Sequence, residues 1–154
     1  MAERWTDEQK SAINEKGRNI IVSAAAGSGK TSVLSERVCR FVADGGDIER
    51  LLVVTFTKAA SKEMRSRIRK KIADLCRAEQ NPETKKRLRR QLVKVGNAKI
   101  STIDSFFGDL VRENFRVAEV SPNFGMLDPA ETAAIEQEAL SAVVERAYED
   151  MSEP

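Results

Sequence analysis

The chain has 154 residues, of which 41% are hydrophobic and 32% are charged, and its formal net charge is +2. This length and composition predict about one globular domain with a real core. The sequence contains no histidine, which excludes histidine catalysis, histidine metal sites and a histidine pH switch. It also lacks a signal-peptide h-region and any apolar run near the roughly 18 residues that cross a bilayer, so we expect a cytoplasmic protein with no membrane partner.

Capping signals and apolar periodicity divide the chain into alternating helices and short strands. Residues 6–9 (TDEQ) have the form of a capping box, and the pairs Asn81-Pro82 and Asp128-Pro129 mark two further helix starts. The apolar run over 51–56 is typical of a buried parallel strand. We expect helices over 7–16, 30–43, 58–79, 82–96, 104–117 and 129–151, and strands over 19–23, 51–56 and 99–103.

This order of elements predicts an α/β fold built from right-handed parallel units. Helix 58–79 is expected to bury an apolar face that consists of Ala59, Met64, Ile68, Ile72 and Leu75. The two cysteines, Cys39 and Cys76, have neither metal-ligand spacing nor disulfide density. Because each falls in a helical pattern, we expect buried free thiols in a reducing cytosol.

Residues 24–31 (AAAGSGKT) lie between the expected strand 19–23 and the expected helix 30–43, which is the context of a phosphate-binding P-loop. Gly27 and Gly29 allow the backbone N–H groups to turn toward phosphate oxygens, and the helix start adds its positive dipole end. The Lys30 ammonium can reach the β- and γ-phosphates, and the Thr31 hydroxyl can ligate Mg²⁺. Ala24 departs from the general motif, which has glycine there. The alternative is an ordinary Gly/Ser turn.

The small net charge hides a strong asymmetry along the chain. Residues 58–94 carry fourteen basic and four acidic side chains, a net charge of +10, whereas residues 109–154 have a net charge of −8. The basic block predicts a polyanionic partner such as nucleic acid. The alternative is that most of these charges are solvated helix faces, some of them paired with the acidic tail.

Four motifs occur in a specific order: Thr6-x-x-Gln9, residues 24–31, residues 53–60 (VVTFTKAA) and residues 101–106 (STIDSF). In this order they resemble the first third of a superfamily 1A DNA helicase. Residues 51–63 and the region 1–128 look most like the helicase subunit of AddAB/RecB-type helicase–nucleases, with UvrD/PcrA-type repair helicases close behind. The resemblance implies a RecA-like P-loop sheet with flanking helices, in which 1–117 is part of domain 1A and 118–154 begins a helical 1B insertion.

The resemblance also implies a nucleotide site for ATP and Mg²⁺. Gln9 matches the glutamine that reads the adenine edge, and the alternative is that it only closes the capping box. Lys30 and Thr31 match the catalytic pair, and Thr31 the Mg²⁺ ligand. The full expected nucleotide set is Gln9, Ala26, Gly27, Ser28, Gly29, Lys30, Thr31 and Ser32.

Two further segments match contacts to single-stranded DNA in these helicases. The matching residues are Thr55, Phe56, Thr57, Lys58, Ser101, Thr102 and Ser105. Hydroxyls can bond backbone phosphates, and Phe56 offers either a face for base stacking or a side chain for the core. Asp104 stands where the family has histidine, and because an acid repels phosphate, we expect it to act as a helix N-cap instead.

The family's Walker B Asp-Glu pair and its second RecA-like domain with arginine fingers have no counterpart in these residues. We therefore expect an N-terminal fragment of an ATP-driven DNA translocase that is inactive alone. Its implied partners are single-stranded DNA, duplex ends, the remaining helicase domains and a second helicase–nuclease subunit. The alternatives are a self-contained small P-loop kinase-like enzyme, which needs an arginine-bearing lid, and a nucleic-acid-binding adaptor with a vestigial P-loop, which Lys30 and Thr31 argue against.

Overall fold

The computed structural model describes residues 5–125 and 127–152, and the chain divides into two compact units, residues 1–110 and 111–154. The elements in chain order are α1 (Asp7–Asn14), α2 (Lys30–Ala43), the 3₁₀ turn η1 (Ile48–Arg50), β1 (Leu52–Thr55), α3 (Lys58–Ala78), α4 (Pro82–Lys94), β2 (Lys99–Thr102), α5 (Ile103–Glu113) and α6 (Pro129–Ser152). The α/β class predicted from the sequence is confirmed. None of the helices described here combines the length and apolarity needed to cross a membrane.

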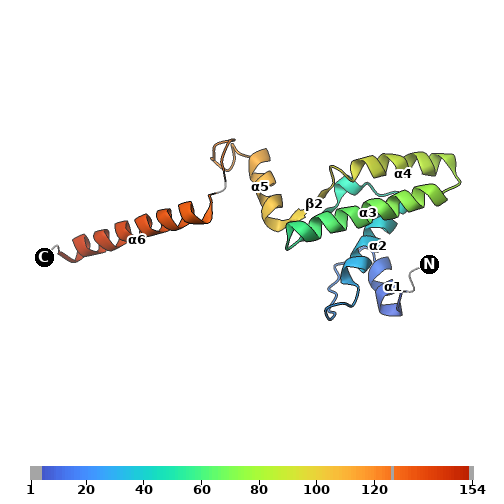
Figure 1. Ribbon diagram of the computed structural model, residues 1–154, viewed down its shortest axis with the longest axis horizontal. Helices are drawn as coiled ribbons and strands as arrows, with labels where there is room; N and C mark the ends of the chain where they lie inside the picture. Colours follow the sequence, from blue (N-terminus) through green and yellow to red (C-terminus); the bar gives the residue numbers. More distant parts are fainter. Residues whose placement is uncertain (1–4, 126, 153–154) are drawn as a thin grey trace. The chain divides into compact units, whose positions relative to one another are not determined.

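The first unit is built around α3, which packs against α2, α4 and both strands (Figure 1). β1 and β2 form a parallel pair whose register aligns Val54 with Ser101 and Thr55 with Thr102. The chain between them passes through α3 and α4, so this is a strand–helices–strand crossover of the expected parallel kind. The core lies where α2, α3, α4 and the strands meet, and its fully buried apolar side chains are Val42, Ile48, Ile68, Ile72 and Val95.

The helix starts follow the capping signals. The Thr6 hydroxyl accepts a hydrogen bond from the Gln9 N–H at 3.3 Å, while Gln9 Oε1 accepts from the Thr6 N–H at 2.9 Å. Asn81 Oδ1 accepts from the Thr84 N–H at 3.0 Å and starts α4. Asp128 Oδ1 accepts from the N–H groups of residues 130 and 131 at 2.8 and 2.9 Å and starts α6, which is exposed over residues 129–149.

The predicted strand 19–23 is wrong, because residues 19–25 are irregular in the structure. Ile21 is 99% exposed, and Ile20 and Val22 are also exposed. Within the described residues, β1 and β2 pair only with each other, so the segment has no neighbour to supply ladder hydrogen bonds. An apolar run indicates that a segment tends to be buried, but a strand also needs a partner edge.

Three other expectations need smaller corrections. The apolar face of α3 includes Met64, Ile68 and Ile72 as predicted, but Ser61 and Cys76 are buried where Ala59 and Leu75 were expected. α1 and α5 end two and four residues early, at Asn14 and Glu113. The cysteine prediction is confirmed, since Cys39 and Cys76 are both free and buried.

Candidate nucleotide site and strand-end polar residues

The glycine loop before α2 contains two glycines in a left-handed backbone conformation and leads directly into the helix, although no strand precedes it in the described residues. Gly27 and Gly29 have φ of 78° and 81°, in the left-handed region that favours glycine. Gly29 is the N-cap of α2 and provides no capping side chain, and the first turn of α2 carries no acid. The N–H groups at this helix end therefore retain their capacity to bind an anion.

Lys30 folds back into the loop that precedes it. Its Nζ donates hydrogen bonds to the carbonyl oxygens of Ala24 and Ala25 at 2.6 and 2.7 Å. Thr31 is exposed, and its hydroxyl makes no hydrogen bond to another residue of the described chain. The loop thus holds the Lys30 ammonium group, which could bind a phosphate group. It also leaves the Thr31 hydroxyl open, which could bind a hard cation that prefers oxygen ligands.

Gln9 joins α1 to this loop as well as closing the capping box. Its Nε2 donates to the Ser28 carbonyl oxygen at 3.1 Å, while its Oε1 is held by the Thr6 N–H. Both ends of the amide therefore have partners within the protein. The sequence signalled the capping box but not this tether, because the contact spans nineteen residues.

Ser32 and Ala26 complete the expected nucleotide set. The Ser32 hydroxyl accepts from Arg67 Nη1 at 3.3 Å, which links the start of α2 to α3. Ala26 is exposed in the loop. The structure therefore brings the whole expected set together around one loop and one helix start.

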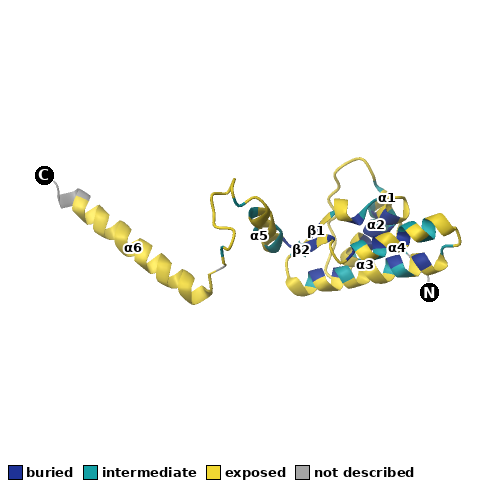
Figure 2. Cartoon of the chain, turned by 90° about the horizontal axis from the view of Figure 1, so that it is seen from above, coloured by how far each residue is buried: buried dark blue, intermediate teal, exposed yellow. Residues whose placement is uncertain are grey.

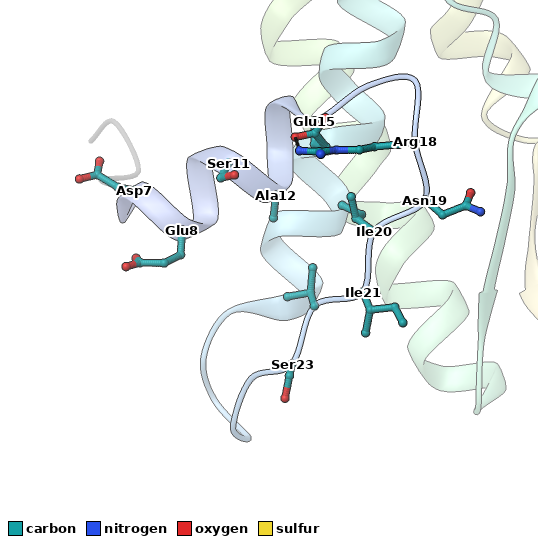
Figure 3. A pocket seen from close by; sticks show the side chains of 11 residues that line it. Asp7, Glu8, Ser11, Ala12, Glu15, Arg18, Asn19, Ile20, Ile21 and Ser23 are labelled. Atoms are coloured by element: carbon teal, nitrogen blue, oxygen red, sulfur yellow. Dashed lines mark hydrogen bonds and ion pairs between the residues drawn. The ribbon is translucent and has the colours of Figure 1, made fainter.

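A hollow of about 750 Å³ lies between α1 and residues 18–23 (Figure 3). Asp7 and Glu8 line it from α1, and Glu15 lines it from the residue that follows this helix. The single base among the lining residues, Arg18, is paired with Glu15 at 2.7 Å. The hydrogen bond from Arg18 keeps the pKa of Glu15 below its usual value, so that carboxylate stays charged. Because its acids outnumber its bases, this hollow suits a polyphosphate poorly. The glycine loop remains the candidate phosphate site.

The register of the β1–β2 pair places Thr55 beside Thr102 at the carboxyl edge of the sheet. Thr55 Oγ1 donates to the Thr57 carbonyl oxygen at 3.0 Å, and Thr57 Oγ1 accepts from the Ala60 N–H at 3.1 Å as the N-cap of α3. Phe56 is 99% exposed, so the core-packing alternative is wrong. Lys58 is exposed at the start of α3. The first expected DNA segment therefore shows an aromatic face and a cation to solvent.

The second expected DNA segment is held by its own hydroxyls. Thr102 Oγ1 lies 2.8 Å from Ser105 Oγ and accepts from the Ser105 N–H at 3.2 Å. Ser101 Oγ donates to the Thr102 carbonyl oxygen at 3.1 Å. Thr102, not Asp104, thus serves the start of α5, and the N-cap expected at Asp104 is wrong. Asp104 lies within the first turn, where its charge complements the helix dipole.

The elements now described define an α/β protein with a parallel strand pair and a glycine loop that leads into a helix. Residues 5–153 match the family model of the UvrD/REP helicase N-terminal domain, and the chain belongs to this family. The relatives are named as subunits of an ATP-dependent helicase/nuclease, which confirms the resemblance to helicase–nuclease proteins.

Three relatives show the extent of the similarity. The chain is 46% identical over 151 residues to the protein of Thermoanaerobacter sp. and 44% identical over 153 residues to that of Ruminiclostridium cellulolyticum. It is 43% identical over 150 residues to the protein of Pediococcus pentosaceus. These alignments cover 96–97% of this chain but only 12% of each relative.

Proposed function

We propose that this chain is the N-terminal ATP-binding part of an ATP-dependent DNA helicase of the helicase–nuclease type, which translocates on single-stranded DNA in repair or recombination. The observation that carries the proposal is the loop over residues 24–31. It has two left-handed glycines, an uncapped helix start and an inward lysine, in a chain of the UvrD/REP helicase family. A self-contained kinase-like enzyme has no comparable support from the relatives.

In this proposal the loop residues cradle the phosphates of ATP. The backbone N–H groups of the loop and of the first turn of α2 bind the phosphate oxygens, and Ser28 gives up its N–H bond to the Ala25 carbonyl oxygen to do so. Lys30 exchanges its two carbonyl partners for the β- and γ-phosphates. The open Thr31 hydroxyl holds Mg²⁺, which supplies charge neutralisation when bound. Gln9 releases one of its amide contacts to read the adenine edge.

The strand-end residues form part of the DNA track. The exposed ring of Phe56 stacks on a base, and Lys58 faces the backbone. The hydroxyls of Thr55, Thr57, Ser101, Thr102 and Ser105 bond phosphate or sugar oxygens from the edge of the sheet. Because most of these hydroxyls already bond the protein, their first role is to fix the shape of that edge.

The parent protein supplies the remaining parts in this proposal. Residues 1–117 belong to domain 1A of a RecA-like core and residues 118–154 begin the 1B insertion. The other helicase domains of the same parent close the ATP site, and a second helicase–nuclease subunit completes the enzyme in the cytoplasm. DNA is engaged as single strands and duplex ends.

Titration of the 154-residue chain with fluorescent ADP and Mg²⁺ tests the nucleotide site. We expect saturable binding that Lys30→Ala abolishes, because this substitution removes the ammonium group from the loop. Lys86→Ala, which removes an exposed lysine on α4, is the matched control and should bind as the native chain does. Binding that survives Lys30→Ala would contradict the assignment of the loop.

A further inference from the structure

The structure divides the basic block 58–94 into two groups of cations. In the first group, Arg65 donates to the carbonyl oxygens of residues 95, 96, 98 and 100 at 2.7–3.1 Å, and Arg87 donates to those of residues 42 and 43 at 2.6 and 2.7 Å. Lys94 pairs with Asp47 and Glu49, and Lys71 pairs with Glu36. These four cations hold helix ends and loops in place, so they are already committed to the fold. Three further cations of this first group also have partners: Arg67 pairs with Glu63, Arg77 pairs with Asp74, and Lys85 donates to the Glu79 carbonyl oxygen.

The second group consists of cations that are exposed on α3 and α4. No side-chain hydrogen bond or ion pair joins these residues to any other residue of the described chain, although Asp and Glu side chains are available on the same helices. We call this group the outer basic surface. It consists of Lys58, Lys62, Arg69 and Lys70 on α3 and Lys86, Arg89 and Arg90 on α4.

Helical spacing gathers these cations into two rows. One side of α3 carries Lys58, Lys62 and Arg69. Lys62 follows Lys58 by four residues and Arg69 follows it by eleven, so this row extends over about 16 Å of the helix. Lys86, Arg89 and Arg90 fall on the side of α4 opposite to its buried residues Leu88 and Gln91. α3 and α4 pack side by side, and their exposed positions face solvent (Figures 1 and 2). The cations are thus spread over two neighbouring helices instead of lining one groove.

The composition of this surface favours a duplex over a single strand. Residues 58–94 contain no Phe, Tyr or Trp, so α3 and α4 themselves offer no platform on which an unpaired base could stack. The Trp5 ring lies against Lys71, which belongs to the first group. A duplex needs no such platform, because it presents a dense array of phosphates, about one charge per 1.7 Å of its axis. Phe56, the aromatic side chain of the candidate single-strand track, lies just outside this range.

We propose that the outer basic surface of α3 and α4 is a second nucleic-acid contact, which binds the phosphate backbone of duplex DNA independently of base sequence. This proposal relies on the proposed function for one point only, which is that the partner is DNA. It assigns the duplex to the outer helix faces and the single strand to the carboxyl edge of the sheet, and Lys58, the first residue of α3, belongs to both contacts. Seven cations on two helices would then hold the duplex next to the part of the protein that tracks one strand.

Fluorescence anisotropy with the 154-residue chain tests this assignment. The probes are a labelled duplex of mixed sequence and a labelled single strand of thymidines, each titrated between about 50 and 200 mM salt. We expect the triple variant Lys62→Gln, Arg69→Gln, Arg89→Gln to bind the duplex more than about tenfold more weakly. The slope of log affinity against log salt should fall by about three, one for each lost phosphate contact. Circular dichroism should show an unchanged fold, because all three side chains are exposed.

The matched control removes the same net charge elsewhere. Lys10→Gln, Lys16→Gln, Arg18→Gln neutralises three exposed cations on and after α1, each of which already pairs with an acid. This variant should keep the duplex affinity and salt slope of the native chain. Equal losses in the two triple variants would overturn the proposal, since the effect would then be one of net charge.

The single-strand probe separates this proposal from the proposed function. Phe56→Ala should weaken single-strand binding and leave duplex binding unchanged, and the outer-surface variant should do the reverse. If the outer-surface variant weakens both probes equally, or if the native chain binds no duplex, the proposal is overturned. The nucleotide titration would be unaffected by either result, because it depends on Lys30 and not on these cations.

Discussion

At position 29, glycine is required by backbone conformation and not by space. Its φ is 81°, and an added Cβ would lie 3.4 Å from Gln9 Nε2, an ordinary van der Waals distance. A residue with a Cβ pays about 1–2 kcal/mol for the left-handed region. We therefore expect Gly29→Ala to lower the free energy of unfolding by about 1–2 kcal/mol, measured by urea denaturation.

Gly96 provides the control for this prediction. Its φ lies outside the left-handed region, and an added Cβ would lie 3.5 Å from the Val93 carbonyl oxygen. Gly96→Ala should leave the free energy of unfolding unchanged or raise it slightly, because alanine restricts the unfolded chain. If Gly29→Ala is equally harmless, the strained loop does not exist in solution.

The Cys39 thiol should be almost inert in the folded chain. The side chain is 3% exposed, and burial raises its pKa to about 12. At pH 8 only about one thiol in 10,000 is then the reactive thiolate, and reagent access is blocked as well. We expect iodoacetamide to label the Cys39 peptide far more slowly in buffer than in urea, as measured by mass spectrometry. Equal rates would show that α2 and α3 separate readily.

Among the elements, one side chain of α3 bonds both β2 and the segment before it. Arg65 donates to four carbonyl oxygens between residues 95 and 100. Arg65→Met would leave these carbonyls without their donor, and we expect the free energy of unfolding to fall by about 3 kcal/mol. Urea denaturation with tryptophan fluorescence or circular dichroism measures the change. Arg65→Lys should recover only part of it, because one ammonium cannot match the guanidinium fork.

Arg69, one helical turn further along α3, is the matched comparison. It is exposed and bonds no other side chain of the described residues, so Arg69→Met should change the free energy of unfolding by less than about 0.5 kcal/mol. A similar loss in both variants would mean that the effect comes from α3 itself and not from the bonds to the β2 segment.

The contact between η1 and α4 should be sensitive to acid. The hydrogen bond from Lys94 holds the pKa of Asp47 below its ordinary value of 3.8, and the same carboxyl caps η1 at the Glu49 N–H. A lowered native pKa stabilises the fold above pH 3.8, and this stabilisation is lost as the pH falls through the lower native value. We expect Asp47→Asn, which keeps a capping oxygen, to lose less stability than the native chain in that window.

Thermal melts at a series of acidic pH values measure this difference. Asp44→Asn serves as a comparison, since Asp44 at the end of α2 pairs with Lys16, which follows α1, and should show its own acid dependence. If the melting temperatures of the native chain and of Asp47→Asn fall equally as the pH is lowered from about 5 to about 2, the Lys94 pair has no role in the acid response.

Local signals in the sequence predicted the helices and both paired strands, because capping residues and apolar periodicity act within a few residues. Thr6, Asn81 and Asp128 start helices as expected. The segment 19–23 failed because strand formation depends on a partner edge that local sequence does not encode. At the candidate site, the left-handed conformation of Gly27 and Gly29 was predictable from the motif, while the role of Lys30 stays a prediction. The Gln9–Ser28 tether and the bonds of Arg65 depend on contacts across 19 or more residues, which local signals do not encode.

At the scale of the whole molecule, the exposed basic side chains and the exposed apolar side chains both indicate surfaces that can bind other molecules. Seven of the fourteen cations in the basic block bond other residues of the first unit, and the other seven are exposed with no such bond in the described residues. Ile20, Ile21 and Val22 next to the glycine loop are also exposed. The chain spans 12% of the length of the relatives it matches. In the proposed function, further parts of the parent protein cover this apolar segment beside the candidate phosphate site.

This view predicts that the 154-residue chain binds nucleotide but does not turn it over. Phosphoryl transfer needs a carboxylate that orients the attacking water beside the metal, in addition to a phosphate cradle. β1 is followed by Phe56-Thr57, and β2 by Ile103-Asp104, so neither described strand leads into an Asp-Glu pair. We expect phosphate release with ATP, Mg²⁺ and single-stranded DNA to equal that of Lys30→Ala.

Turnover that disappears in Lys30→Ala would contradict this prediction and show that the chain holds a complete catalytic set. Fluorescent-ADP binding to the same samples separates the two causes of inactivity. Binding without turnover would show that the chain lacks the residues that orient the attacking water. No binding by the native chain would instead mean that the loop carbonyls of Ala24 and Ala25 hold Lys30 more tightly than a phosphate can, until another part of the parent protein closes the site.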